Sequence, residues 1–292
     1  MENMLNYYYG INVIDIKKYD NYYLVKTEDD IYILNEIYEE DTLKEIIDYL
    51  NNTNILYHLL LLNKDKEITF VYDNKKYSLF KVRNNQSNIS IFDFANLSCN
   101  GKCNWGELWS KRVDYYLEQI KEIVSSNEIK YVMDYYISLA EIAISYFNNL
   151  QELYNDKNLF YSISHRNISS PLNGYEHFNP ANMCKDLSIR DVAEYIKMSF
   201  FDDILTNNEI IILIDKITLN EEMANYLLVR LIYPSYFFNL FDKYIENREV
   251  DKKIYTYIKK SRDFETLLSL IYNKLKINFN IRAFIYFFKS EY

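Results

Sequence analysis

Residues 162–201 read SISHRNISSPLNGYEHFNPANMCKDLSIRDVAEYIKMSFF, and their pattern changes near Ser188. The part before Ser188 is polar and lacks helical periodicity, and it contains His165 and several asparagines. From Ser188 onward, apolar residues recur at the spacing of an amphipathic helix. Loops held by regular elements often carry binding or catalytic side chains. The segments on either side of this loop predict the fold that holds it.

The sequence that flanks the loop is predicted to be helical. Two amphipathic stripes precede the loop, and the helical pattern after Ser188 continues almost to residue 292, with Pro234 as the only strong breaker. The first stripe consists of Trp109, Val113, Tyr116, Leu117, Ile120 and Val124, and the second of Ile129, Met133, Tyr136, Ala140, Ile144 and Phe147. Residues 107–292 are therefore predicted to form a mainly helical lobe.

The first 83 residues are predicted to form strands and one helix. Strand-like segments occupy 10–18, 22–27 and 31–37, and 67–72 with 76–83 has the pattern of a hairpin. Between them, residues 41–52 place apolar residues at helical spacing, and Thr42 with Glu45 matches a capping box. This order predicts an antiparallel-sheet lobe with one helix.

Residues 84–106 have no clear periodicity and are predicted to be a linker and loop. The predicted organisation is thus 1–83 as an N-terminal sheet lobe, 84–106 as linker and loop, and 107–292 as a C-terminal helical lobe. A small sheet lobe, a linker and a larger helical lobe with a polar loop in its middle form the plan of a two-lobed, kinase-like α+β fold.

Composition excludes several classes of protein. The chain has 292 residues, of which 49% are hydrophobic, so it can bury a sizeable core. A net charge of -9 disfavours nucleic acid and anionic membrane surfaces as partners. The longest apolar run, residues 55–62, is too short for a membrane span, and the first residues lack the pattern of a signal peptide.

The cysteines and histidines do not predict a metal centre. Cys99 and Cys103 have a C-x3-C spacing, but no second pair completes a zinc site, and the three histidines are scattered. Three cysteines are also too few for a disulfide framework. We expect no metal and no disulfide.

The loop and three further stretches carry a family resemblance. "WSKRVD" at 109–114, "LAEIAI" at 139–144 and "RDVAEYI" at 190–196 resemble bacterial spore coat proteins of the CotS type, and most closely their YutH-like branch. Those proteins belong to the aminoglycoside-phosphotransferase-like superfamily of kinase folds. The resemblance covers most of the chain, and it implies a two-lobed protein-kinase-like fold.

The resemblance also implies which residues of this chain stand at the catalytic and metal-binding positions of the superfamily. His165 matches the histidine of the superfamily's His-x-Asp motif, but Asn167 stands at the catalytic aspartate, and Leu172 stands where an asparagine is expected. The metal-binding aspartate falls at Asn179 or at Asn182, depending on where the alignment gap is placed.

The lysine that contacts nucleotide falls at Asn35, on the predicted strand 31–37. Asp186 and Lys26 are the nearest charged residues that could stand in for the lost groups. An asparagine offers a neutral oxygen, but it cannot act as a base near neutral pH, and magnesium prefers anionic oxygen. We therefore expect no nucleotide or metal cofactor.

Two residues match structural positions of the superfamily. The resemblance implies that His165 and Asp191 connect the loop to the following helix by hydrogen bonds. Two plainer alternatives stay open: His165 is an ordinary structural histidine, and Asp191 completes a helix cap begun at Ser188.

These residues predict a kinase-like scaffold without phosphotransfer. The resemblance implies a structural or assembly role in the bacterial endospore coat, with other coat proteins as partners, after synthesis in the mother-cell cytoplasm. Two alternatives remain: a small-molecule phosphotransferase with displaced catalytic groups, and a non-catalytic module that binds a nucleotide or metabolite.

Overall fold

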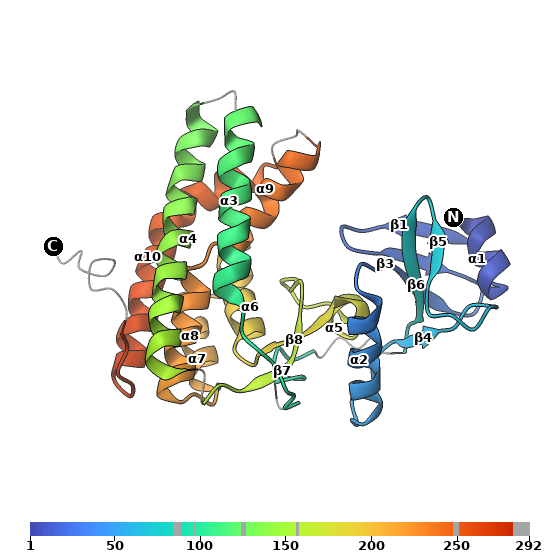
Figure 1. Cartoon of the computed structure of the whole chain (residues 1–292), viewed down its shortest axis with the longest axis horizontal. Coiled ribbons are helices and arrows are strands. Elements are labelled where there is room, and N and C mark those ends of the chain that lie inside the picture. The colour runs from blue at the N-terminus through green and yellow to red at the C-terminus, as the bar shows by residue number, and fades with distance from the viewer. Residues whose placement is uncertain (84–88, 96, 124–126, 156–157, 248–250, 283–292) are drawn as a thin grey trace. The chain divides into compact units, whose positions relative to one another are not determined.

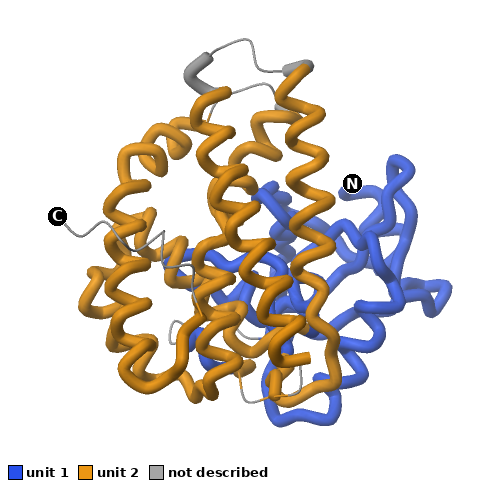
Figure 2. Tube along the Cα trace, turned by 60° about the vertical axis from the view of Figure 1, so that its left-hand side comes forward, with its two compact units in different colours: residues 1–93, 163–185 blue, residues 94–162, 186–292 orange. Residues whose placement is uncertain are grey.

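The computed structural model describes the chain except for residues 84–88, 96, 124–126, 156–157, 248–250 and 283–292. The chain divides into two compact units. Residues 1–93 and 163–185 form unit 1, and residues 94–162 and 186–292 form unit 2 (Figure 2). The polar loop at 163–185, which the sequence places within the helical lobe, is thus grouped with the N-terminal sheet.

Unit 1 is built on an antiparallel sheet (Figure 1). Its strands lie in the order β1-β2-β3-β6-β4, and β5 also pairs with β6. The strand bounds are Asp15–Lys18 (β1), Tyr23–Lys26 (β2), Ile31–Glu36 (β3), Leu59–Leu61 (β4), Phe70–Tyr72 (β5) and Lys75–Lys81 (β6). The five predicted strand segments correspond to β1, β2, β3, β5 and β6.

Two helices of unit 1 pack on the sheet, α1 (Glu2–Tyr9) and α2 (Glu40–Asn51). α1 inserts Leu5 into the apolar cluster on one face, beside Val25 and Leu34. α2 inserts Leu43 into the cluster on the other face, beside Ile33. Because successive residues of a strand point to opposite faces, β3 contributes to both clusters.

Neither α1 nor β4 is predicted from the sequence. α1 is short and rich in tyrosine, which favours strands, and burial of Leu5 against the sheet is what stabilises it. β4 lies in a continuous leucine run without alternation, so periodicity could not identify it.

The polar loop of residues 166–182 lies between two paired strands, β7 (Tyr161–His165) and β8 (Met183–Leu187). It contains a short helix, α5 (Gly174–His177), and a 3-10 turn, η1 (Pro180–Asn182). Side chains at both η1 and α5 reach the sheet, since Tyr175 and Ala181 pack against the same apolar cluster as Ile33 and Phe80.

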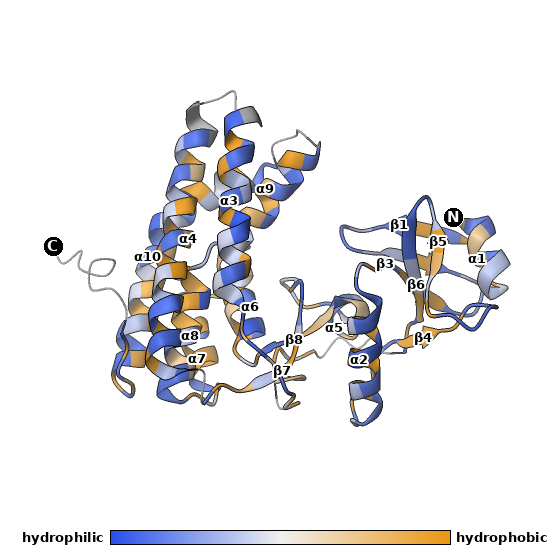
Figure 3. Ribbon diagram, viewed as in Figure 1, coloured by the Kyte–Doolittle hydropathy of each residue, from blue (hydrophilic) through white to orange (hydrophobic). Residues whose placement is uncertain are grey.

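Unit 2 is mainly helical (Figure 1). α3 packs against α4, α4 against α8, and α8 against α6 and α10. Hydrophilic and hydrophobic residues alternate in bands along α3 and α4, as expected for amphipathic helices (Figure 3). The bounds are Trp105–Ile123 (α3), Asn127–Tyr154 (α4), Arg190–Phe201 (α6), Asn207–Asp215 (α7), Glu221–Ile232 (α8), Ser235–Asn247 (α9) and Lys253–Lys276 (α10).

Candidate functional site

The structure brings Asn35 and Asn179 into direct contact. Asn179 Nδ2 donates a hydrogen bond to Asn35 Oδ1 at 2.9 Å, and both side chains are buried. Asn35 in turn donates to the carbonyl of Asn21 at 3.0 Å, and Asn179 Oδ1 accepts from the Ala181 N–H at 3.1 Å. These bonds occupy both the oxygen and the nitrogen of each amide.

Asn182 and Asn167 form a second pair within the same loop. Asn182 Oδ1 accepts from the Asn167 N–H at 3.0 Å, and Asn182 Nδ2 donates to the Asn167 carbonyl at 2.8 Å. The side chain of Asn182 therefore binds the backbone of Asn167 on both sides, as a strand neighbour would. Of the two candidates for the metal position, Asn179 is the one that reaches Asn35.

Two ion pairs fasten α2 to the ends of the loop. Arg166 Nη2 lies 2.9 Å from Glu39 Oε2, and Lys185 Nζ lies 2.9 Å from Glu45 Oε2. The predicted capping box at Thr42 and Glu45 is therefore wrong: the helix begins at Glu40, and Glu45 points to Lys185 instead.

The three histidines of unit 1 are buried, and the rings of His58 and His165 bond to backbone carbonyls. His165 Nε2 bonds to the carbonyl of His177 at 2.8 Å, and the two rings stack with centroids 4.6 Å apart. His58 Nε2 bonds to the carbonyl of Gly174 at 3.1 Å. Burial lowers the pKa of His58 to about 4 and the pKa of His177 to about 3. The rings of His58 and His177 are therefore neutral near neutral pH.

Asp186, the candidate replacement acid, is buried at the end of β8 and already has partners. Its two carboxylate oxygens accept from Trp105 Nε1 at 2.9 and 3.1 Å, and it forms an ion pair with Arg190. Its Oδ1 also accepts from the Leu187 N–H at 2.7 Å. A carboxylate with these partners is positioned to join β8 to α3 and α6.

The remaining predicted residues lie in different surroundings. Lys26 is exposed at the end of β2, and Leu172 is half-buried in the loop. Asp191 is buried in the first turn of α6. No Ser188 cap precedes it, because the helix begins after Ile189 without a side-chain cap.

A buried charged cluster in unit 2 was not predicted. Glu194 of α6 accepts from Lys197 Nζ at 2.8 Å and from Arg230 Nε of α8 at 2.6 Å, and Ser235 donates to its other oxygen at 2.6 Å. Burial alone would raise the pKa of the Glu194 carboxyl, but the Lys197 and Arg230 cations and these hydrogen bonds lower it well below its usual value. The i, i+3 spacing of Glu194 and Lys197 was the available signal, but it equally describes a solvated helix face.

The side chains at the positions that the resemblance assigns to the lysine, the catalytic aspartate and the metal-binding aspartate are neutral amides. Asn35 and Asn179 bond to each other, and Asn182 binds the backbone of Asn167. Among the described residues, no group of three or more histidine, cysteine or acidic side chains is arranged to hold a metal ion. The described residues likewise include no helix with the length and apolar composition needed to cross a membrane.

Solved structures with the same architecture are small-molecule kinases by their descriptions. An aminoglycoside phosphotransferase from Alicyclobacillus acidocaldarius aligns with a TM-score of 0.60 at 8% identity, covering 91% of this chain and 93% of that one. Spectinomycin phosphotransferase APH(9)-Ia in complex with ADP and spectinomycin aligns with a TM-score of 0.56 at 12% identity, covering 94% of this chain and 97% of that one. Choline kinase LicA from Streptococcus pneumoniae aligns with a TM-score of 0.52 at 11% identity, covering 92% of this chain and 97% of that one. The protein therefore has a two-lobed, kinase-like α+β fold.

The family follows from the sequence match. Residues 2–271 match the model of the family described as spore coat putative kinase YutH, and the chain belongs to that family. No curated protein matches the chain. The identities of 8% to 12% to the solved structures establish the fold alone.

Proposed function

We propose that this protein is a catalytically inactive kinase homologue that serves as a structural or assembly component of the bacterial endospore coat. The hydrogen bond between Asn35 and Asn179 is the observation that carries the proposal. Its two residues stand where the resemblance implies the nucleotide lysine and one candidate for the metal-binding aspartate. Both amides are engaged in bonds within unit 1 rather than offered to a ligand.

The residues present do not fit magnesium and ATP. Phosphoryl transfer depends on positioned charges: a lysine and metal ions on the phosphates, and a carboxylate that orients the acceptor hydroxyl. Asn35, Asn167, Asn179 and Asn182 supply no charge, and Asp186 is already bound to Trp105 and Arg190. We propose that the protein needs no cofactor.

The coat role rests on the family to which the chain belongs. Other coat proteins are its proposed partners, and the proposed route is synthesis in the mother-cell cytoplasm followed by incorporation into the coat. A fluorescent fusion expressed during sporulation should move to the spore surface. A fusion that stays dispersed in the mother cell throughout sporulation would contradict the coat role.

Nucleotide binding separates this proposal from its alternatives. A ligand raises the melting temperature only if it binds the folded protein. Because we propose that the folded protein does not bind ATP with magnesium, we expect the melting temperature to stay unchanged in millimolar concentrations of both. A rise of several degrees would instead support a nucleotide-binding module.

Turnover is tested by ATP consumption with a panel of hydroxyl-bearing acceptors. Wild type, Asn167→Asp and Lys26→Ala should give the same background rate of ATP consumption. Asn167→Asp restores only one of several catalytic groups that act together, so it should restore little activity, and Lys26→Ala removes a residue that we propose has no catalytic role. Lys26 is exposed, so its substitution leaves the fold intact. Wild-type turnover that Lys26→Ala abolishes would establish a phosphotransferase with displaced groups.

A further inference from the structure

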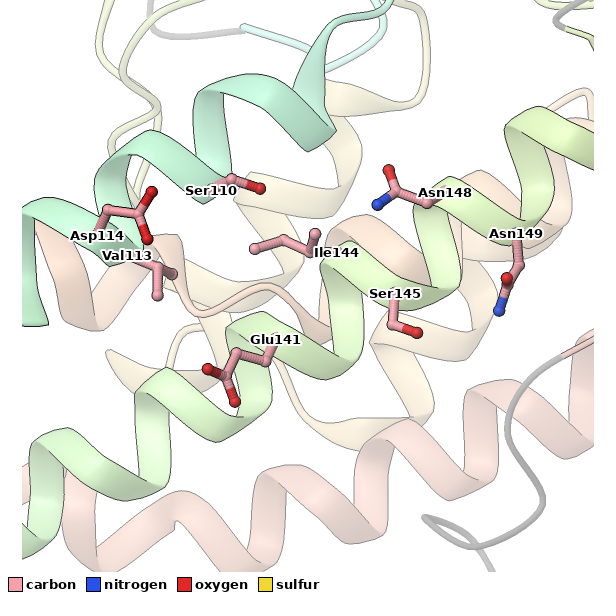
Figure 4. Close-up of a pocket in the computed structure, with 8 residues that line it drawn as sticks. All are labelled: Ser110, Val113, Asp114, Glu141, Ile144, Ser145, Asn148 and Asn149. Carbon is pink, nitrogen blue, oxygen red and sulfur yellow. The ribbon is translucent and has the colours of Figure 1, made fainter.

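The helix pair α3 and α4 carries a pocket that the proposed function does not use. Its volume is about 470 Å³, and the two helices lie side by side along it (Figures 1 and 4). α3 contributes Ser110, Val113 and Asp114, and α4 contributes Glu141, Ile144, Ser145, Asn148 and Asn149.

The pocket carries negative charge without a compensating cation. Asp114 and Glu141 supply one carboxylate from each helix (Figure 4), and the lining contains no lysine, arginine or histidine. Neither carboxylate forms an ion pair or hydrogen bond with another described residue.

Cations nearby on α3 are held elsewhere. Lys111 Nζ lies 2.7 Å from Glu107, and Arg112 Nη2 lies 2.6 Å from Asp242 of α9. These two cations therefore do not neutralise the negative charge of Asp114 and Glu141, which can attract a cation from another molecule. The net charge of -9 would favour the approach of that cation.

The remaining lining indicates the form of the occupant. Serine hydroxyls and asparagine amides offer acceptors to an ammonium or guanidinium group, and the partly exposed Ile144 offers apolar contact to an aliphatic stem. Sites for small molecules enclose most of the ligand, whereas Asp114 and Glu141 are exposed. Leu117, one turn beyond Asp114 on α3, is 40% exposed and extends the surface. An open acidic groove with an apolar margin suits a chain segment that lies across it.

We propose that the α3–α4 groove is a docking surface for a lysine- or arginine-bearing segment of a partner protein. The proposal does not depend on the absence of phosphotransfer, because no residue of the loop takes part. A basic side chain would place its charge between Asp114 and Glu141, while its stem contacts Ile144.

The test measures binding of a fluorescein-labelled eight-residue peptide of alternating lysine and alanine, by fluorescence anisotropy at fixed salt. The double variant Asp114→Asn/Glu141→Gln should weaken binding at least tenfold. The matched control is Glu118→Gln/Glu152→Gln, which removes the same charge from exposed positions on the same helices, outside the pocket lining. It should change binding less than twofold.

Four outcomes would overturn the proposal. Equal weakening in both double variants would mean that the peptide senses only the net charge. Equal binding of a glutamate–alanine peptide, or no binding of the lysine peptide to wild type, would exclude a basic segment. Spermidine that binds the groove as tightly as the peptide would make it a site for small amines. Circular dichroism melting verifies that all variants are folded.

Discussion

At the level of single residues, the asparagines of the loop have a defined structural role. An amide carries both a donor and an acceptor, whereas an ionised aspartate only accepts and a lysine only donates. Asn35 uses both groups, one toward Asn21 and one toward Asn179. An aspartate at position 179 would place a carboxylate, which only accepts hydrogen bonds, beside the acceptor Asn35 Oδ1. Asparagine at both positions therefore fits the observed hydrogen bond, whereas the catalytic aspartate paired with Asn35 would not.

Replacing Asn179 tests this role. Asn179→Ala leaves the buried Asn35 Oδ1 and the Ala181 N–H without their partner, and we expect a loss of about 1–3 kcal/mol in the free energy of unfolding. Urea denaturation measures the loss. The exposed Asn54→Ala serves as control and should stay within about 0.5 kcal/mol of wild type. Equal stability of the two variants would show that the Asn35–Asn179 bond contributes nothing.

At the level of elements, α6 and α8 are joined by the buried carboxylate of Glu194. Lys197 is fully buried, and besides Glu194 it donates to the carbonyls of Arg230 and Tyr233 at 3.0 and 3.1 Å. Trp105 also lies over the Arg230 guanidinium, with 4.8 Å from its ring centroid to Cζ. The cluster therefore connects four helices of unit 2, since Trp105 belongs to α3 and Ser235 is the first residue of α9.

Removing the charge of Glu194 should be costly. Glu194→Gln keeps the shape but leaves Lys197 and Arg230 buried without an anion, and breaking such a network typically destabilises by about 3–5 kcal/mol. Urea unfolding at pH 7 is the measurement, with the exposed Glu118→Gln as control. A loss under about 1 kcal/mol would show that water or a neighbouring group already screens the two cations.

The sequence predicts elements better than it predicts their contacts. Five strand segments and α2 follow from local periodicity, and the resemblance identifies the loop. The partner of Asn179 could not be found this way, because Asn35 lies 144 positions away along the chain. Asp186 likewise depends on Trp105, which is 81 positions away, so a residue considered as a stand-in acid is committed to packing. Such pairs are set by the tertiary fold, not by local pattern.

At the level of the whole molecule, buried histidines should make stability depend on pH. His58 is fully buried and its pKa is lowered from the ordinary 6.5 to about 4. As pH falls below 6.5, His58 takes up a proton in the unfolded chain before it does so in the folded protein. The contribution of His58 to the free energy of unfolding is therefore complete above pH 6.5 and is lost as the pH falls toward 4. His177 acts in the same direction.

His58→Gln removes this titration while keeping a donor for Gly174. The variant should be less stable at pH 7.5, but the difference from wild type should narrow between pH 6.5 and 4, by up to about 1.4 kcal/mol per pH unit. Urea denaturation across this range measures it, and carboxylates common to both proteins cancel in the difference. Parallel pH profiles would show that His58 does not drive the loss.

The grouping of residues 163–185 with the N-terminal sheet constrains the order of events during synthesis. The sheet face that carries Ile33 and Phe80 is covered partly by Tyr175 and Ala181. A ribosome that has made the first 93 residues has delivered the strands and α2, but not Tyr175 and Ala181. The part of the face that these two residues cover stays exposed to water, and to chaperones, until a further segment of about 90 residues has emerged. The smaller unit is begun first, yet it can be completed only after both long helices α3 and α4 have been made.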